Sequence, residues 1–240
     1  DIMLLFSKDG EYALEKFKNN NHAQLIFTHN LSLSNNSLIN LYSSNIFFIE
    51  IIRNPIFVIS NYENFLMRFD SPKEFTPSFY INQKKFPWFT SSYKESLENL
   101  SDIEIAILII INSYKKYFQE REKYFKLKNY LEVCFEELIF NTNKVIEDIE
   151  IYIGKQRNPK KIRKQYTKLK LPRDYIIKGL KSGTEKLNNK PNQTLFKNDL
   201  DYCEYHINRI KNKIPNLLFQ EFIELVNKFQ DLYPFFRYKI

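Results

Sequence analysis

The distribution of apolar positions along the chain singles out three stretches that are typical of strands. Residues 46–52 (IFFIEII) are β-branched and aromatic, with apolar side chains on both faces, which predicts a central strand of a sheet. Residues 129–135 (NYLEVCF) and the shorter run 23–27 (AQLIF) have a similar character. We therefore expect a sheet whose strands come from well-separated parts of the chain.

Between and after these strands, the spacing of apolar residues predicts helices. Pro55 opens a predicted helix over residues 55–68, because proline is tolerated in a first helical turn. Gly154 is a usual C-terminal stop for a helix over residues 143–153. Further helices are expected at residues 11–18, 34–42, 101–126, 199–214 and 217–232. This alternation predicts an α/β fold, in which helices flank a central parallel sheet and the C-terminal part is helical.

Three segments are predicted to be irregular. Residues 70–92 contain three prolines and the only tryptophan, which indicates a long loop. Such a loop either forms a binding surface or packs its aromatic residues on the core, and the sequence leaves both readings open. Residues 136–138 are expected to turn the chain, and residues 180–194 form a polar loop.

Length and charge narrow the class of protein. The 240 residues fit one domain, and 43% hydrophobic residues argue against global disorder. The net charge of +8 favours anionic partners, although a lysine-rich proteome would give the same balance. Residues 155–173 hold nine of the lysines and arginines and no acidic residue; with the C-terminal helices they make up a basic and helical part, residues 155–240.

The composition also argues against several classes of site and location. Cys134 and Cys203 stand far apart, and the three histidines are scattered, so we expect neither a disulfide scaffold nor a metal. No apolar run reaches the roughly 18 to 20 residues that span a bilayer. We expect a cytoplasmic protein, with a lost N-terminal leader or anchor as the open alternative because the chain begins at Asp1.

Side chains that could bind a ligand or take part in a reaction follow each predicted strand. FTH stands at residues 27–29, RNP at residues 53–55 and EEL at residues 136–138. The carboxyl ends of parallel strands gather at one edge of a sheet, where ligands bind. Arg53 is suited to bind a phosphate there, because its guanidinium is always charged and a helix N-terminus beside it offers free N–H groups.

In their order, these pieces resemble the sulfotransferases that use 3′-phosphoadenosine-5′-phosphosulfate (PAPS). That family has a strand ending in Lys-Thr-His, then a strand ending in Arg-[Asp/Asn]-Pro with a serine further on, and later a strand of the type Val-x-Tyr-Glu-Asp-Leu. This chain has FTH, RNPIFVISNY and VCFEEL in the same order, and the likeness covers roughly residues 23–154. The resemblance implies a P-loop-like sulfotransferase fold.

The resemblance also implies a role for individual residues. Arg53 would hold the 3′-phosphate of the nucleotide, and either Ser60 or Asn61 would hydrogen-bond the same phosphate. His29 matches the base that takes the proton of the acceptor, work that suits a neutral imidazole. Phe135 stands where the family has a tyrosine near the adenine.

Other positions depart from the family pattern. Phe27 replaces a lysine, and the family's late Arg-Lys-Gly loop is matched only by Lys178 and Gly179. The family's Pro-Lys-Ser-Gly-Thr-Thr loop, which cradles the 5′-phosphosulfate, has no counterpart before His29. We expect it to lie upstream of Asp1; the alternative is a chain that is not a competent enzyme by itself.

Taken together with the features above, the resemblance implies a sulfotransferase that moves a sulfuryl group from PAPS to a hydroxyl or amine. The acceptor is a small molecule or a glycan, and Phe86, Trp88 and Phe89 are expected to line part of its pocket. No nucleic acid and no metal are expected. The alternatives are a non-catalytic sulfotransferase-like protein and a basic nucleic-acid-binding protein that uses residues 155–173 and Tyr166.

Overall fold

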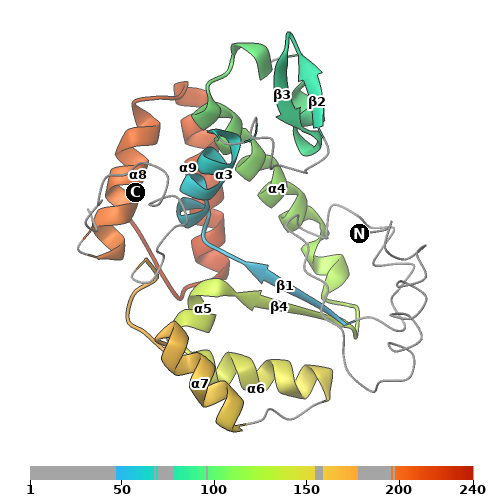
Figure 1. Cartoon of the computed structure of the whole chain (residues 1–240), viewed down its shortest axis with the longest axis vertical. Helices are drawn as coiled ribbons and strands as arrows, with labels where there is room; N and C mark the ends of the chain where they lie inside the picture. Colours follow the sequence, from blue (N-terminus) through green and yellow to red (C-terminus); the bar gives the residue numbers. More distant parts are fainter. Residues whose placement is uncertain are drawn as a thin grey trace. The chain divides into compact units, whose positions relative to one another are not determined.

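A computed structural model describes residues 47–67, 69, 78–95, 97–154, 159–177, 196 and 198–239. All of them belong to one compact unit. The predicted elements at residues 11–18, 23–27 and 34–42 and the polar loop at residues 180–194 lie outside the described residues. Helices dominate the described part of the chain, and a small parallel sheet crosses it (Figure 1).

The parallel sheet is formed by two predicted strands. β1 (Phe48–Ile52) pairs with β4 (Tyr130–Cys134) in parallel, so that Glu50 stands opposite Glu132 and Ile52 opposite Cys134. Both strands are therefore confirmed, as is their parallel direction. Within the described residues the sheet has only these two strands, and the larger P-loop-like sheet stays a prediction.

The predicted helices around the sheet are present. α4 (Asp102–Tyr124) begins with a capping box, in which the Ser101 side chain and the Glu104 side chain satisfy each other's backbone N–H groups. α6 (Thr142–Ile153) ends at Gly154, whose φ of 64° is the left-handed conformation that favours glycine at this position. Ile103, Ile107, Ile110 and Ile111 of α4 belong to the main core.

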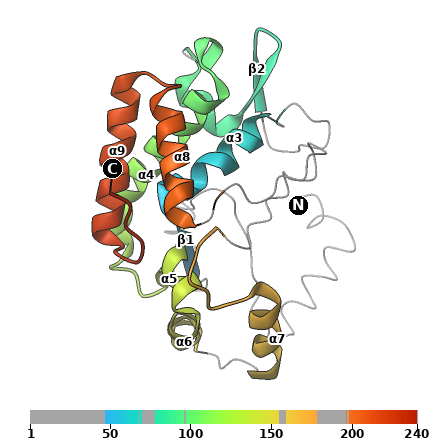
Figure 2. The same ribbon diagram turned by 90° about the vertical axis from the view of Figure 1, so that its left-hand side faces the viewer.

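The C-terminal helices pack against the segment that follows β1. That segment consists of a 3-10 helix, η3 (Pro55–Val58), and α3 (Ile59–Met67). α8 (Asp199–Lys211) contacts η3, and α9 (Asn216–Leu232) contacts η3 and α4, so these elements enclose one core (Figure 2). The proline-led helix is confirmed, but its first turn is a 3-10 turn. α7 (Pro159–Leu169) lies in the basic segment.

Two irregular segments were predicted wrongly. Within the expected loop at residues 70–92, the structure has a hairpin of β2 (Ser78–Ile81) and β3 (Lys84–Pro87), followed by the 3-10 helix η4 (Trp88–Tyr93); η5 (Leu97–Asn99) comes next. Asn82 and Gln83 both have positive φ, as a two-residue hairpin turn of type I′ requires. The expected turn at residues 136–138 is instead part of a helix, α5 (Phe135–Phe140), which starts directly from β4.

None of the helices in the described residues is long and apolar enough to cross a membrane.

Candidate functional site

The backbone around Arg53 is held in place from two sides. Asn54 is fully buried; its side-chain oxygen accepts a hydrogen bond from the N–H of Ile56 at 3.0 Å and so caps η3. The N–H of Asn54 donates to Glu136 Oε1 at 3.0 Å, and the hydroxyl of Tyr114 donates to the carbonyl of Arg53. These bonds fix where the Arg53 side chain starts, at the carboxyl end of β1.

Two of the three nitrogens of the Arg53 side chain, Nε and Nη2, are buried without a hydrogen-bond partner among the residues that the structure describes, although the residue as a whole is half-buried. The guanidinium carbon lies 4.7 Å from the centre of the Phe135 ring and 5.6 Å from that of Phe57. Burial lowers the pKa of Arg53, and the nearby charge of Glu136 opposes this shift. Buried donors of a cation that lack hydrogen bonds are costly, so Nε and Nη2 of Arg53 are suited to receive an anion.

Glu136 is the nearest compensating charge, but its oxygens are already in use. It is buried, with Oε1 accepting the Asn54 N–H and Oε2 accepting the Cys134 thiol at 3.2 Å. Burial raises the pKa of Glu136, and the hydrogen bond from Asn54 opposes that shift. Glu136 therefore ties the start of α5 to the residue after Arg53, and its attraction for Arg53 acts without a hydrogen bond.

Arg173 adds positive charge to the same region. It lies close enough to Arg53 to contribute to the lowering of its pKa. Its backbone N–H donates to the carbonyl of Ile139 at 3.1 Å, and its Nη2 donates to the carbonyl of Ile176 at 3.2 Å. The potential at the carboxyl ends of β1 and β4 is thus shaped by Arg53, Arg173 and Glu136, and the charge of the buried Asp199 acts on Arg173.

Ser60 lies at the start of α3 and faces α8. Its hydroxyl is 3.2 Å from the Tyr202 hydroxyl and 3.2 Å from Nε2 of His206. Tyr202 in turn stacks on Phe57 with ring centres 5.5 Å apart, and Phe57 is one of the two rings over which Arg53 lies. Asn61 is exposed. Of the two candidates for the phosphate-binding residue, only Ser60 is thus connected to Arg53 through packed side chains.

The other predicted site residues fall in different places. Phe86 is 1% exposed and packs with Leu97 and Ile105. Of the two alternatives for the aromatic residues of this segment, Phe86 follows the one in which they pack on the core. Phe89 is half-buried, and Trp88 is 45% exposed. His29, Lys178 and Gly179 lie outside the described residues.

The basic segment shows an ordinary solvated helix where its side chains are described. Lys164 and Lys168 of α7 are exposed, whereas Tyr166 is half-buried with a buried hydroxyl. An aromatic residue that stacks on bases needs an open ring face. The half-buried state of Tyr166 does not decide whether a ring face is open, so the nucleic-acid alternative stays a prediction.

Tyr202 and His206 were not found by sequence reasoning. They are four residues apart on one helix, a spacing that places both on the same face, but 142 and 146 residues separate them from Ser60. The sequence placed Glu136 in an expected turn, whereas its bond to Asn54 spans 82 residues. Nothing in the local sequence indicates contacts of this range.

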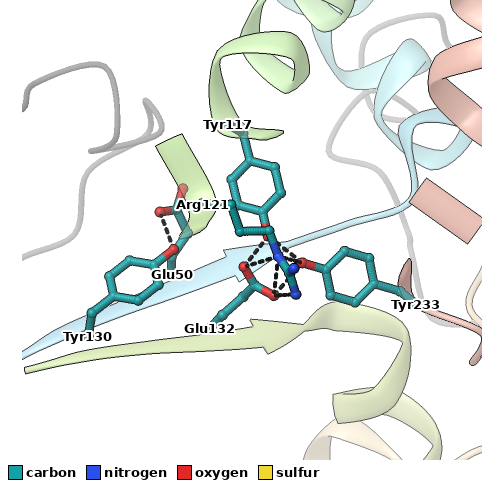
Figure 3. A network of polar contacts seen from close by, with 6 residues as sticks. All are labelled: Glu50, Tyr117, Arg121, Tyr130, Glu132 and Tyr233. Atoms are coloured by element: carbon teal, nitrogen blue, oxygen red, sulfur yellow. Dashed lines mark hydrogen bonds and ion pairs between the residues drawn. The ribbon is translucent and has the colours of Figure 1, made fainter. Parts of the chain in front are cut away.

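A second buried polar cluster lies along the same two strands (Figure 3). Glu132 of β4 accepts hydrogen bonds from the hydroxyls of Tyr117 and Tyr233 and pairs with Arg121, whose Nη2 is 3.2 Å from Oε1. Glu50, opposite Glu132 on β1, accepts from the Tyr130 hydroxyl at 3.0 Å.

Only one of the two carboxylate oxygens of Glu50 has a hydrogen-bond partner in this cluster. Its Oε1 is buried and has no partner among the described residues. Burial raises the pKa of Glu50 to about 7. The hydrogen bond from Tyr130 opposes this shift, and the charge of Glu132 adds to it.

In the described residues, no group of His, Cys, Asp and Glu side chains is placed to hold a metal ion. Comparisons with protein-family models, curated proteins and solved structures return no match.

Proposed function

We propose that this chain binds PAPS and transfers its sulfuryl group to a hydroxyl or amine of an acceptor, which is a small molecule or a glycan. The observation that carries the proposal is the Arg53 guanidinium, buried with two nitrogens unpaired where two parallel strands end. A 3′-phosphate would supply both the missing acceptors and the missing charge. Charge-assisted bonds of this kind are about twice as strong as neutral ones.

The surroundings of Arg53 support a nucleotide over a small inorganic anion. Phe135 offers an aromatic ring beside the guanidinium, at the position that the resemblance assigns to the adenine. Arg53 occupies one face of this ring, so a base would stack on the other face or on the ring edge. Tyr202 and Phe57 add further aromatic surface around the same charge.

The proposed reaction breaks the bond between sulfur and the oxygen that bridges it to the 5′-phosphate, and forms a bond from sulfur to the acceptor oxygen or nitrogen. Adenosine 3′,5′-bisphosphate leaves, and the acceptor proton passes to a base. The resemblance assigns that base to His29, and the binding of the 5′-phosphosulfate to the family's Pro-Lys-Ser-Gly-Thr-Thr loop. Arg53 takes no part in the transfer itself; it holds the nucleotide in position for it.

Calorimetric titration with adenosine 3′,5′-bisphosphate tests the proposal on the full-length chain. We expect the wild type to bind it, and to bind 5′-AMP more weakly because that nucleotide lacks the 3′-phosphate. Arg53→Ala should lower the affinity for the bisphosphate about 100-fold, in line with loss of a buried charge-assisted contact. It should also abolish the preference over 5′-AMP.

Arg237→Ala is the matched control, since Arg237 is an exposed arginine whose loss changes the net charge equally. Its affinity should stay within about twofold of wild type. Absence of binding by the wild type would refute the proposed function. An Arg53→Ala variant that binds as well as wild type would refute the role of Arg53.

A further inference from the structure

The side chains between α3 and α8 form a short chain of polar contacts that ends beside Arg53. Ser60 stands between Tyr202 and His206, whose rings are 4.3 Å apart. Tyr202 also stacks on Phe57, the ring that Arg53 overlies. Burial raises the pKa of Tyr202, whereas its bond to Ser60 and the charge of Arg53 lower it, which shows that Arg53 and Tyr202 are electrostatic neighbours.

The direction of the hydrogen bonds follows from the protonation of His206. Burial, and then the charge of Arg209, lower the pKa of His206 to about 4, so at neutral pH its ring carries one N–H. Nδ1 is buried without a partner among the described residues. A buried N–H without an acceptor is rare, so the hydrogen belongs on Nε2, where Ser60 accepts it.

This assignment leaves one hydrogen available at the end of the chain of contacts. Ser60 accepts from His206, and either hydroxyl can be the donor between Ser60 and Tyr202. When Ser60 is that donor, the hydrogen of Tyr202 has no acceptor among the described residues. Tyr202 is the member of the cluster that shares the Phe57 ring with Arg53 and acts electrostatically on it, so its hydroxyl is the candidate for contact with an anion there.

We infer that the Tyr202 hydroxyl donates a second hydrogen bond to the anion that pairs with Arg53, and that Ser60 and His206 are positioning residues for it. The inference rests on the proposed anion site at Arg53. It differs from the expectation drawn from the sequence, in which Ser60 or Asn61 contacts the phosphate directly. Asn61 is exposed, and Ser60 is held between two side chains of α8.

Titration of adenosine 3′,5′-bisphosphate into single and double variants distinguishes two arrangements. In one, Tyr202 contacts the anion and Ser60 positions it; in the other, Ser60 contacts the anion directly. Tyr202→Phe keeps the ring stacking and should weaken binding about tenfold, the effect of one hydrogen bond to a charged group. Ser60→Ala should weaken binding about threefold, because it only loosens the tyrosine. The double variant should bind like Tyr202→Phe alone, since Ser60 acts through Tyr202. A purely structural role of Ser60 would not produce this non-additivity.

Tyr205→Phe is the control, because Tyr205 also packs against His206 but is 49% exposed. Its affinity should equal that of wild type. Additive losses from Ser60→Ala and Tyr202→Phe would show that Ser60 contacts the anion itself and would overturn the inference. Wild-type affinity in Tyr202→Phe would overturn it too.

These outcomes are distinguishable from failure of the proposed function. If Arg53→Ala weakens binding but Tyr202→Phe does not, the anion site stands and only the role of α8 is wrong. If the wild type does not bind the bisphosphate, the proposed function fails and the inference fails with it. Urea denaturation of each variant confirms that the titrated protein is folded; should Tyr202→Phe be unfolded, wild-type affinity in Ser60→Ala would overturn the inference.

Discussion

Arg53 and Arg121 lie beside the same two strands and over aromatic rings, yet their surroundings are opposite. Arg121 is 4.1 Å from the centre of Phe125, and its Nε and Nη2 bond to Glu132. Burial works against its charge, but the hydrogen bonds and charge of Glu132 raise its pKa. The pKa of Arg53 is lowered by burial, and its Nε and Nη2 have no partner among the described residues.

This difference in hydrogen bonding indicates that Arg121 stabilises the fold and that Arg53 is suited to bind a ligand. The partners of Arg121 are part of the fold, so its contribution is present without any ligand. The charge of Arg53 is held at the end of β1 by backbone contacts of Tyr114 and Glu136, which do not depend on its side chain. A buried polar group that lacks a hydrogen-bond partner is more typical of functional sites than of cores.

The largest effect is expected from Glu132→Gln, which removes the charge that satisfies Arg121. Two tyrosine hydroxyls and the guanidinium of Arg121 would lose their charged acceptor in a site where the Glu132 side chain is only 6% exposed. We expect the free energy of unfolding to fall by about 3 to 5 kcal/mol, the usual result of breaking a buried ion pair. Urea denaturation measures it.

Glu137→Gln is the matched control for this change. Glu137 also forms an ion pair, with Lys144 at 2.8 Å, but the Lys144 side chain is 66% exposed. Its loss should cost less than about 1 kcal/mol. Equal effects of the two variants would mean that burial does not distinguish these pairs.

A somewhat smaller effect is expected from Glu50→Gln, and it depends on pH. The pKa of Glu50 is raised from 4.5 to about 7 in the folded chain. The folded state therefore binds the proton more tightly than the unfolded state does. The stability that this gives is fully present below about pH 4.5 and is lost as pH rises through about 7.

Above pH 7, the ionised Glu50 should cost about 3 kcal/mol relative to pH 4, since each pKa unit corresponds to about 1.4 kcal/mol. Glu50→Gln cannot ionise and keeps an oxygen for the Tyr130 hydroxyl. At pH 8 it should be more stable than wild type by up to this amount, and at pH 4 nearly equal to it. Urea denaturation gives the free energy of unfolding of both proteins at each pH. The same difference between wild type and Glu50→Gln at pH 4 and at pH 8 would contradict this expectation.

The extent to which sequence predicted the structure depends on the range of the interactions involved. β1, β4, α4 and α6 follow from runs and periodicities within a few residues, and all four were predicted. The β2–β3 hairpin was missed because the prolines of residues 70–92 outweighed the turn signal of Asn82. α5 was missed because Glu136 is polar in sequence but buried by its contacts with distant residues.

The candidate site divides in the same way. Arg53 was predicted because a charged residue at the end of an apolar run is visible in the sequence itself. Its orphaned nitrogens, and the approach of Tyr202 and His206 to Ser60, result from packing α8 on η3 and α3. No pattern along the chain encodes which side chains of α8 arrive there.

Urea denaturation of Arg53→Met and Arg121→Met, with and without adenosine 3′,5′-bisphosphate, tests the contrast between the two arginines most directly. Arg121→Met should lose about 3 kcal/mol but keep the stabilisation by ligand, about 2.7 kcal/mol at a concentration 100 times Kd. Arg53→Met should match wild type within about 1 kcal/mol without ligand and gain nothing from it. An Arg53→Met variant that is strongly destabilised, or that the ligand stabilises as it does the wild type, would contradict a binding role for Arg53.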